Sequence, residues 1–258
     1  MDAAPALWLP AKPAIIRPAP DELLRYAGDP VLAALPGMVM PPVVLSSPTG
    51  LEVSRVGENS FNGGSSGNYT PQEYAVNFGD AAADREIFLT IIAGFQGSPV
   101  LSSVTIGGVG ATIHVNGKSA GATSYIAAIA SAAVPTGTSG TVSLAFSDGG
   151  LRRSGVVAYR VTGRPAGAAV ATYTNEDVSS SPTLTTSAGG LVLAVRHLAS
   201  SSSGGDIVAD GMTTYSTVID GDAGDHFSGV AIAAGASLDI AFVASSASTR
   251  ISAAASFA

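Results

Sequence analysis

The sequence predicts an all-β protein, an antiparallel β-sandwich or jelly roll preceded by an extended, proline-rich N-terminal arm. From about residue 46 onward, short runs rich in Val, Ile, Thr and Ala are separated by Gly, Ser, Asn and Pro, as strands are separated by turns. No helical segments stand between these runs, which favours a sandwich over an α/β fold. Residues 1–45 instead contain prolines at intervals too short for a regular strand or helix. We therefore assign 1–45 to the arm and 46–258 to the sandwich domain.

Within the sandwich domain, fourteen runs are expected to form strands. They are 51–56, 73–78, 86–95, 101–108, 111–116, 123–134, 140–147, 155–163, 168–175, 190–198, 213–220, 227–235, 236–244 and 249–258. Val104, Ile106, Ile113 and Val115 fall on one face of two consecutive runs, and the GVG between the runs supplies a turn, so these two strands should form a hairpin. The segment GRPAG (163–167) is a possible division into two halves, although a single sandwich is preferred.

The arm carries many large apolar side chains between its prolines, among them Trp8, Ile15, Ile16, Leu35 and Met38. Burying half of the arm's apolar side chains is worth on the order of 10 kcal/mol before ordering entropy is subtracted, so the arm should be docked on something. Two interpretations stand. The arm packs across its own domain, or it crosses onto a neighbouring subunit or a partner protein. The second is favoured because proline-rich extended segments enter grooves at low entropic cost.

Composition limits the classes of partner. The net charge is −7 and basic residues are not clustered, which argues against a nucleic-acid groove. The chain has no cysteine, so neither a disulfide nor a thiolate metal site is expected. The N-terminus lacks the features of a secretory signal, and no apolar run of about 18 residues indicates a membrane span. Only 12% of residues are charged, roughly half the usual share, which suggests a surface that faces other protein in an assembly.

Motifs for chemistry are weak. GKSAG (117–121) and GGSSG (63–67) match the G-x-S-x-G elbow of serine hydrolases, but such matches arise by chance in a Gly- and Ser-rich chain. Neither motif sits at the turn from a strand to a helix in a parallel sheet, where that elbow is found. The three histidines, His114, His197 and His226, lack the spacing that brings two imidazoles to one metal. We expect ordinary hydrogen-bonding roles for them.

Acidic residues give no clear site either. Asp220, Asp222 and Asp225 share one loop that could chelate Ca²⁺, but Ala231 stands where an EF-hand needs glutamate, so a surface turn is the preferred interpretation. Paired carboxylates for glycoside hydrolysis need a cleft with aromatic platforms. The candidate acids Glu73, Asp84 and Glu86 have no such platform nearby, and the chain has a single tryptophan. No enzymatic activity, cofactor or metal is expected.

Two stretches resemble known proteins. LWLPAKPAIIRPA followed by LPGM resembles an N-terminal segment of virion structural proteins from tailed bacteriophages and prophages, where it precedes β-rich domains of differing type. SSVTIGGVGATIHV, VPTGTSGTVSLAFSDG, GVVAYRVTG and TTSAGGLVLAV resemble a β-sandwich module of phage head-decoration and tail-fibre proteins. Together the two stretches cover most of the chain.

The resemblance implies a virion protein, assembled in the host cytoplasm, whose arm binds a major capsid protein or another virion protein. As a capsid cement or decoration protein it would stabilise the outside of the head, and we expect a homotrimer with no nucleic-acid or membrane partner. Alternatives are a tail or head fibre module that binds host surface glycan, and a secreted carbohydrate-active enzyme, which the lack of a signal peptide and of an acid pair disfavours. The partner-binding residues implied are Trp8, Pro10, Lys12, Pro13, Ile15, Ile16, Arg17, Pro18, Leu35 and Met38.

Overall fold

The computed structural model describes residues 44–47, 50–62, 71–120, 123–147, 150–165, 167–177, 179–198, 205–218, 225–244 and 250–258. All of them belong to one compact unit, Val39–Ala258. The described residues form strands, turns and irregular segments without a helix, and each described pair of neighbouring strands is antiparallel. The predicted class, an all-β antiparallel sandwich, is confirmed for this part of the chain. None of these residues lies in a helix of the length and hydrophobicity needed to cross a membrane.

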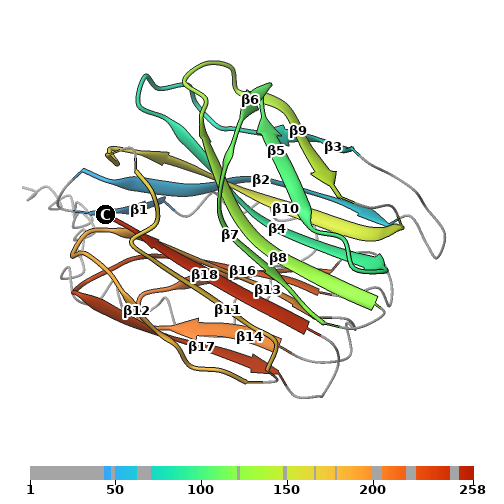
Figure 1. Ribbon diagram of the computed structural model, residues 1–258. Helices are drawn as coiled ribbons and strands as arrows, with labels where there is room; N and C mark the ends of the chain where they lie inside the picture. The colour runs from blue at the N-terminus through green and yellow to red at the C-terminus, as the bar shows by residue number, and fades with distance from the viewer. Residues whose placement is uncertain are drawn as a thin grey trace, which may run out of the picture. The chain divides into compact units, whose positions relative to one another are not determined.

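Ten strands of the described residues precede the GRPAG segment and form two sheets (Figure 1). The six-stranded sheet has the order β1-β2-β10-β4-β8-β7 and the four-stranded sheet the order β3-β9-β5-β6. Their bounds are β1 (Val44–Ser46), β2 (Glu52–Asn62), β3 (Gln72–Asn77), β4 (Glu86–Gln96), β5 (Leu101–Ile106), β6 (Val109–Gly110), β7 (Thr112–Lys118), β8 (Thr123–Ala133), β9 (Ser139–Phe146) and β10 (Leu151–Thr162). We call this set of strands the first roll.

In the described part of the chain after the GRPAG segment, eight strands form the second roll. Its five-stranded sheet has the order β11-β18-β13-β16-β15, and its three-stranded sheet the order β12-β17-β14. The bounds are β11 (Ala171–Asn175), β12 (Thr183–Thr185), β13 (Leu191–Leu198), β14 (Gly205–Ala209), β15 (Thr213–Val218), β16 (Asp225–Ile232), β17 (Ser237–Ala244) and β18 (Arg250–Phe257).

Both rolls use the same nested pairing of strands. In the first roll β2 pairs with β10, β3 with β9, and β4 with β8. In the second roll β11 pairs with β18, β12 with β17, and β13 with β16. Pairing the first strand with the last, and so on inward, is the wrapping of a jelly roll. The sandwich expected over 46–258 therefore consists of two jelly rolls of corresponding topology, joined through the segment that was considered as a possible division.

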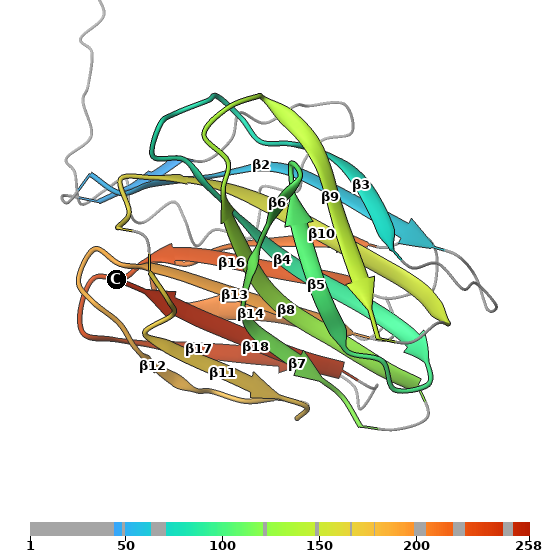
Figure 2. The same cartoon turned by 45° about the horizontal axis from the view of Figure 1, so that its top comes forward.

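Three apolar cores separate the four sheets. One fills the first roll, between its six-stranded and four-stranded sheets, and one fills the second roll, between its five-stranded and three-stranded sheets. The third joins the six-stranded sheet to the five-stranded sheet, with side chains such as Phe88, Ile129, Leu193 and Phe257. We call this interface the seam. Figure 2 shows the four-stranded sheet on the face of the six-stranded sheet that points away from the seam.

The two sheets that meet at the seam are covered on both faces, and their sequences show it. Every residue of β13 is buried, and β4 is buried from Ile87 to Phe95. Both strands are accordingly nearly continuous apolar runs rather than alternating ones, interrupted by Arg196 and His197 in β13 and by Thr90 in β4. Alternation is retained in outer strands such as β3, where Tyr74 and Val76 face the core and their neighbours face solvent.

The prediction that residues 101–108 and 111–116 form a hairpin is wrong. β5 turns at Gly107 and Gly108, which have φ of 59° and 82°, and pairs with the short strand β6. β7 instead pairs with β8 in the other sheet, and a register shift lies between Ile113 and Val115. Across this β-bulge at His114, Ile113 faces the core of the first roll and Val115 faces the seam, so the two side chains do not share the face that the prediction assigned to them.

The other predicted strands are observed with ends that shift by a few residues, whereas β1, β6, β12 and β14 were not predicted. β1 lies at the edge of the six-stranded sheet and pairs with β2 through Val44, Leu45 and Ser46. The final two residues assigned to the arm, Val44 and Leu45, thus belong to the first roll.

Candidate functional site

The seam contains the chain's three histidines and most of the described ionisable groups that are buried. His114 lies on β7 of the first roll, and His197 and His226 lie on β13 and β16 of the second. His197 and His226 are fully buried and His114 is half-buried. Because this concentration of polar groups interrupts an apolar interface, the seam is the candidate functional site in the described part of the chain.

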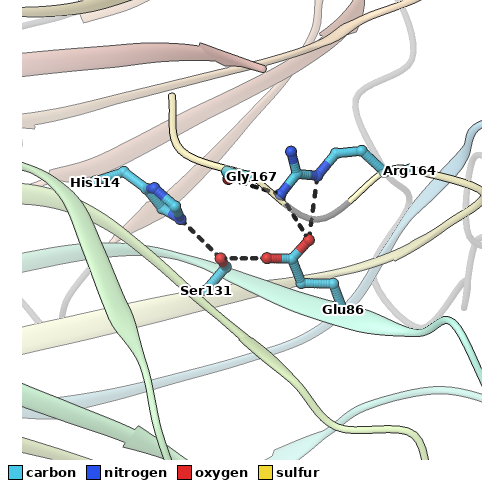
Figure 3. Close-up of polar contacts among 5 residues, drawn as sticks. All are labelled: Glu86, His114, Ser131, Arg164 and Gly167. Atoms are coloured by element: carbon cyan, nitrogen blue, oxygen red, sulfur yellow. Dashed lines mark hydrogen bonds and ion pairs between the residues drawn. The ribbon is translucent and has the colours of Figure 1, made fainter. Parts of the chain in front are cut away.

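At one end of the seam, four side chains form a polar network (Figure 3). His114 Nε2 lies 2.7 Å from Ser131 Oγ, and Ser131 Oγ donates to Glu86 Oε1 at 2.5 Å. Glu86 Oε2 accepts hydrogen bonds from Arg164 Nε at 3.1 Å and Nη2 at 2.8 Å. Since the single hydroxyl proton of Ser131 goes to Glu86, His114 Nε2 must carry the proton that completes the network.

Aromatic rings surround this network. The His114 ring stacks on Phe88 with a centroid distance of 5.9 Å and meets Phe257 edge to face at 4.8 Å. The Arg164 guanidinium lies over the same two rings, 5.2 Å from the Phe88 centroid and 5.1 Å from that of Phe257. Arg164 belongs to the segment between the rolls and Phe257 to the final strand of the second. The network therefore ties the connection and both rolls together.

Burial lowers the pKa of His114, while Glu86 opposes this effect and Arg164 reinforces it. The imidazole is therefore neutral at pH 7. The Arg164 side chain is 2% exposed and that of Glu86 is 17% exposed, so this ion pair is largely removed from water. A paired, hydrogen-bonded charge of this kind is costly to break on one side only.

Ser131, His114 and Glu86 include the residue types of a catalytic triad but not its arrangement. In a triad the histidine contacts both the nucleophile and the acid. Here the serine contacts both others, and Ser131 is 3% exposed, which leaves its oxygen without access to a substrate. The group fastens β4, β7 and β8 to the segment that leads into the second roll.

Toward the other end of the seam, His197 and His226 lie directly opposite each other on β13 and β16. The His226 Nε2 atom is 3.3 Å from Thr90 Oγ1 of β4, and the His197 ring meets Tyr125 of β8 edge to face at 4.8 Å. Burial lowers the pKa of both histidines to about 3. Neighbouring charge acts in the same direction, since Arg153 and His226 lower the pKa of His197 and Arg55 lowers that of His226.

A further polar contact crosses the seam, apart from the His114 network and from the pair His197 and His226. Tyr159 of β10 donates its hydroxyl proton to Ser228 Oγ of β16 at 2.9 Å. Burial raises the pKa of Tyr159, which therefore stays neutral. Nearby, the Arg55 guanidinium lies 4.7 Å from the ring centroid of Tyr215 on β15.

The G-x-S-x-G motif at 117–121 has a structural role. Ser119 Oγ accepts a hydrogen bond from the Tyr125 amide at 2.9 Å, and the Ser119 amide donates to Tyr125 O at 2.8 Å. A Cβ atom on Gly117 would lie 3.0 Å from Thr174 Cγ2 and 3.2 Å from Ile251 Cγ1 of the second roll. Gly117 thus allows the rolls to approach, and Ser119 closes the β7–β8 turn.

The remaining predicted candidates are not brought together by the described contacts. Glu73 is exposed on β3, Asp84 accepts from the Gly163 amide at 2.8 Å, and Glu86 belongs to the seam. Among the described residues, no group of three or more His, Asp or Glu side chains could hold a metal ion. GGSSG and the side chains of Asp220, Asp222 and Asp225 lie outside the described residues.

The predicted partner-binding residues also lie outside the described residues, so their role stays a prediction. They are Trp8, Pro10, Lys12, Pro13, Ile15, Ile16, Arg17, Pro18, Leu35 and Met38.

Comparison with known proteins yields no match to a family model, to a curated protein or to a solved structure.

Sequence reasoning identified the three histidines but not their common location. Each was assigned an ordinary role on a strand or loop, because the spacing within the chain does not show that β7, β13 and β16 line the same interface. The bulge that places His114 at the seam leaves no signal in the sequence, because Thr112, Ile113, His114 and Val115 alternate regularly between polar and apolar.

Proposed function

We propose that this chain is a structural virion protein of a tailed bacteriophage, a capsid cement or decoration protein that binds the outside of the head through its N-terminal arm. Its mechanism is additional buried interface between capsid subunits, without catalysis. The observation that carries the proposal is the arm itself, whose sequence combines closely spaced prolines with large apolar residues and resembles an attachment segment of virion proteins.

Within the described part of the chain, strands of the two rolls build the three apolar cores, one of which is the seam. In the sequence the arm precedes β1, an edge strand that pairs with β2. In the proposal, Trp8 fills a pocket on the partner, and Lys12 and Arg17 pair with acidic groups there, as buried aromatic and arginine anchors commonly do.

The test is deletion of residues 1–43, which removes the arm but retains β1. The shortened protein should stay folded and soluble but no longer join particles, as measured by its occupancy on purified heads. In the full chain, a Trp8→Ala and Arg17→Ala double variant should weaken binding about 30-fold. A matched control is Thr141→Ala, at an exposed position of β9, which should bind as the original chain does.

Unchanged incorporation of the shortened protein would refute the attachment role. Reproducible binding of the shortened protein to one sugar class on a glycan array would favour the fibre module instead.

A further inference from the structure

We propose that the seam is an acid-sensitive joint, which opens reversibly in mildly acidic solution through protonation of His197 and His226 while each roll keeps its own core. This inference concerns the described body of the chain and does not depend on the proposed attachment role. It rests on the position of the two histidines, on the groups that face them, and on the separation of the seam from the other two cores.

The position of the two histidines makes a pair of charges costly. His197 and His226 are direct cross-strand partners, and both are fully buried at the seam. Side chains directly opposite on antiparallel strands have Cβ atoms about 5 Å apart, and like charges there repel. The groups that contact their rings, Thr90 and Tyr125 of the first roll, are neutral.

The surrounding ionisable groups do not compensate. Arg153 of β10 acts on His197 and Arg55 of β2 acts on His226, and both are cationic. The backbones of Ala93 and Ile126 favour a protonated His197, but their effect is smaller than that of burial.

Farther out, Glu58 pairs with Arg55, and the Arg55 guanidinium lies over the ring of Tyr215. Tyr159 belongs to the seam and donates to Ser228. Asp225 and Arg250 stand opposite Leu198 on the neighbouring strands, and their side chains lie outside the described part of the chain.

His114 differs from this pair, because Ser131 links it to the carboxylate of Glu86. A proton on His114 would therefore meet a nearby negative charge. Its titration should contribute less to opening than that of His197 and His226.

The sign of the pH effect follows from these positions. In the closed seam both histidines stay neutral until the pH approaches about 3, whereas exposed histidines protonate near pH 6.5. The open state therefore binds more protons between these values, and the closed state loses stability as the pH falls below about 6.5. For two histidines, the opening equilibrium should rise about 10³-fold between pH 7.5 and 5.0, which lies above the usual range of carboxylate titration.

Opening should be confined to the seam, because the other two cores contain no histidine. The first roll's core and the second roll's core are made of apolar residues that face away from the seam. Adjacent alanines on one strand separate the two environments. Ala127 and Ala253 face the seam, whereas Ala128 and Ala254 face the cores of their own rolls.

These alanines supply matched reporters, since the chain has no cysteine. We would prepare four full-length variants, Ala127→Cys, Ala128→Cys, Ala253→Cys and Ala254→Cys, all at positions without solvent exposure. Each thiol would be labelled by exchange with a dipyridyl disulfide. The rate of exchange in the folded variant would be divided by the rate of exchange in the same variant unfolded at the same pH.

The two seam thiols should become about 10³-fold more reactive on this scale between pH 7.5 and 5.0, and should be protected again when the pH returns to 7.5. The thiols of Ala128→Cys and Ala254→Cys should change less than about threefold. An equal rise at all four positions would show global unfolding and overturn the proposal, as would continued protection of the seam thiols at pH 5.0.

A second measurement assigns the effect to the histidines. In the Ala127→Cys background, the His226→Gln substitution keeps an amide that can reach Thr90 and should reduce the pH effect to about 30-fold. Adding His197→Phe, which keeps a ring against Tyr125, should reduce it below about tenfold. A full 10³-fold response in either variant would refute the assignment.

Discussion

The two rolls share one strand order but differ in how much of their stability is internal. Among the described residues, the core of the first roll contains 22 buried apolar residues, with Phe78, Phe95 and Phe146 among them. The core of the second roll contains 13, four of which are alanines. Because apolar burial is the main favourable contribution to folding, the first roll is the more self-sufficient unit.

Corresponding ends of the two rolls show the same difference. In the first roll the buried Arg85 guanidinium donates to five backbone carbonyls, those of Phe78, Gly79, Val134, Thr136 and Gly137. These carbonyls lie in the β3–β4 and β8–β9 connections.

The equivalent connections of the second roll, β12–β13 and β16–β17, are joined by a smaller side chain and by backbone bonds. Thr186 Oγ1 donates to Gly235 O at 2.6 Å, and the Thr186 amide donates to Ala236 O at 2.9 Å. A charged group that holds several carbonyls binds more strongly than one hydroxyl, so this end is more firmly held in the first roll.

The comparison indicates that the second roll depends on the first. One face of its five-stranded sheet presents Leu191, Leu193 and Val195 to the seam, and the first roll covers them. Duplication of the topology has thus not produced two equivalent domains. Both rolls have a core of their own, but the second gains a larger share of its stability from the seam.

The largest expected effect comes from separating the rolls. Residues 167–258 produced alone should keep the core of the second roll but unfold at a lower urea concentration than residues 1–165 alone, because the second core is smaller and the seam face of the five-stranded sheet is exposed to water. Circular dichroism in urea and size-exclusion chromatography would measure this. Mixing the two fragments should restore part of the lost stability. Equal urea midpoints for the two fragments would show that the dependence is absent.

A smaller effect is expected from the two end contacts. Arg85→Met should lower the free energy of unfolding by about 3–5 kcal/mol, since it leaves several buried carbonyls without donors. Thr186→Val, the matched change in the second roll, should cost about 1 kcal/mol. Urea unfolding of both variants gives the two values. Equal losses would remove the asymmetry between the rolls.

The smallest effect compares one hydroxyl at the seam with one inside the first roll. Tyr159→Phe removes the bond to Ser228, and Tyr74→Phe removes the bond to Ser154. Each change should cost about 1 kcal/mol in thermal or urea unfolding. Adding Ser228→Ala to Tyr159→Phe should restore part of the loss, because the serine hydroxyl is no longer left unpaired. No recovery in the double variant would mean that the hydroxyl pair does not couple the rolls.

Sequence patterns predicted the long strands well, because runs such as those of β4, β8 and β13 are apolar, bounded by turn residues and long enough to be recognised. The strands that were missed are short. β6 has two residues and β12 has three, and such segments become strands only because a neighbouring strand offers hydrogen bonds. Tertiary pairing, rather than local preference, determines them.

The arrangement of the site could not be predicted from the sequence. Glu86, Ser131 and Arg164 are far apart along the chain, and their contacts depend on which strands become neighbours. The duplicated topology was also missed, although TVSLAF of β9 and SLDIAFVA of β17 occupy corresponding positions. Comparing the two halves of the chain for such pairs would have indicated the repeat.

The nested pairing also has a consequence for the order of folding. β2 must wait for β10, since Thr162 pairs with Glu52, and closing so long a loop is entropically unfavourable and slow. β13 and β18 dock on β4, β7 and β8 of the same sheet, which belong to the first roll. During synthesis the first roll leaves the ribosome first and can close while the second is still being made. Chain order and structural dependence therefore agree, and a circular permutant that places residues 167–258 first should fold more slowly and aggregate more.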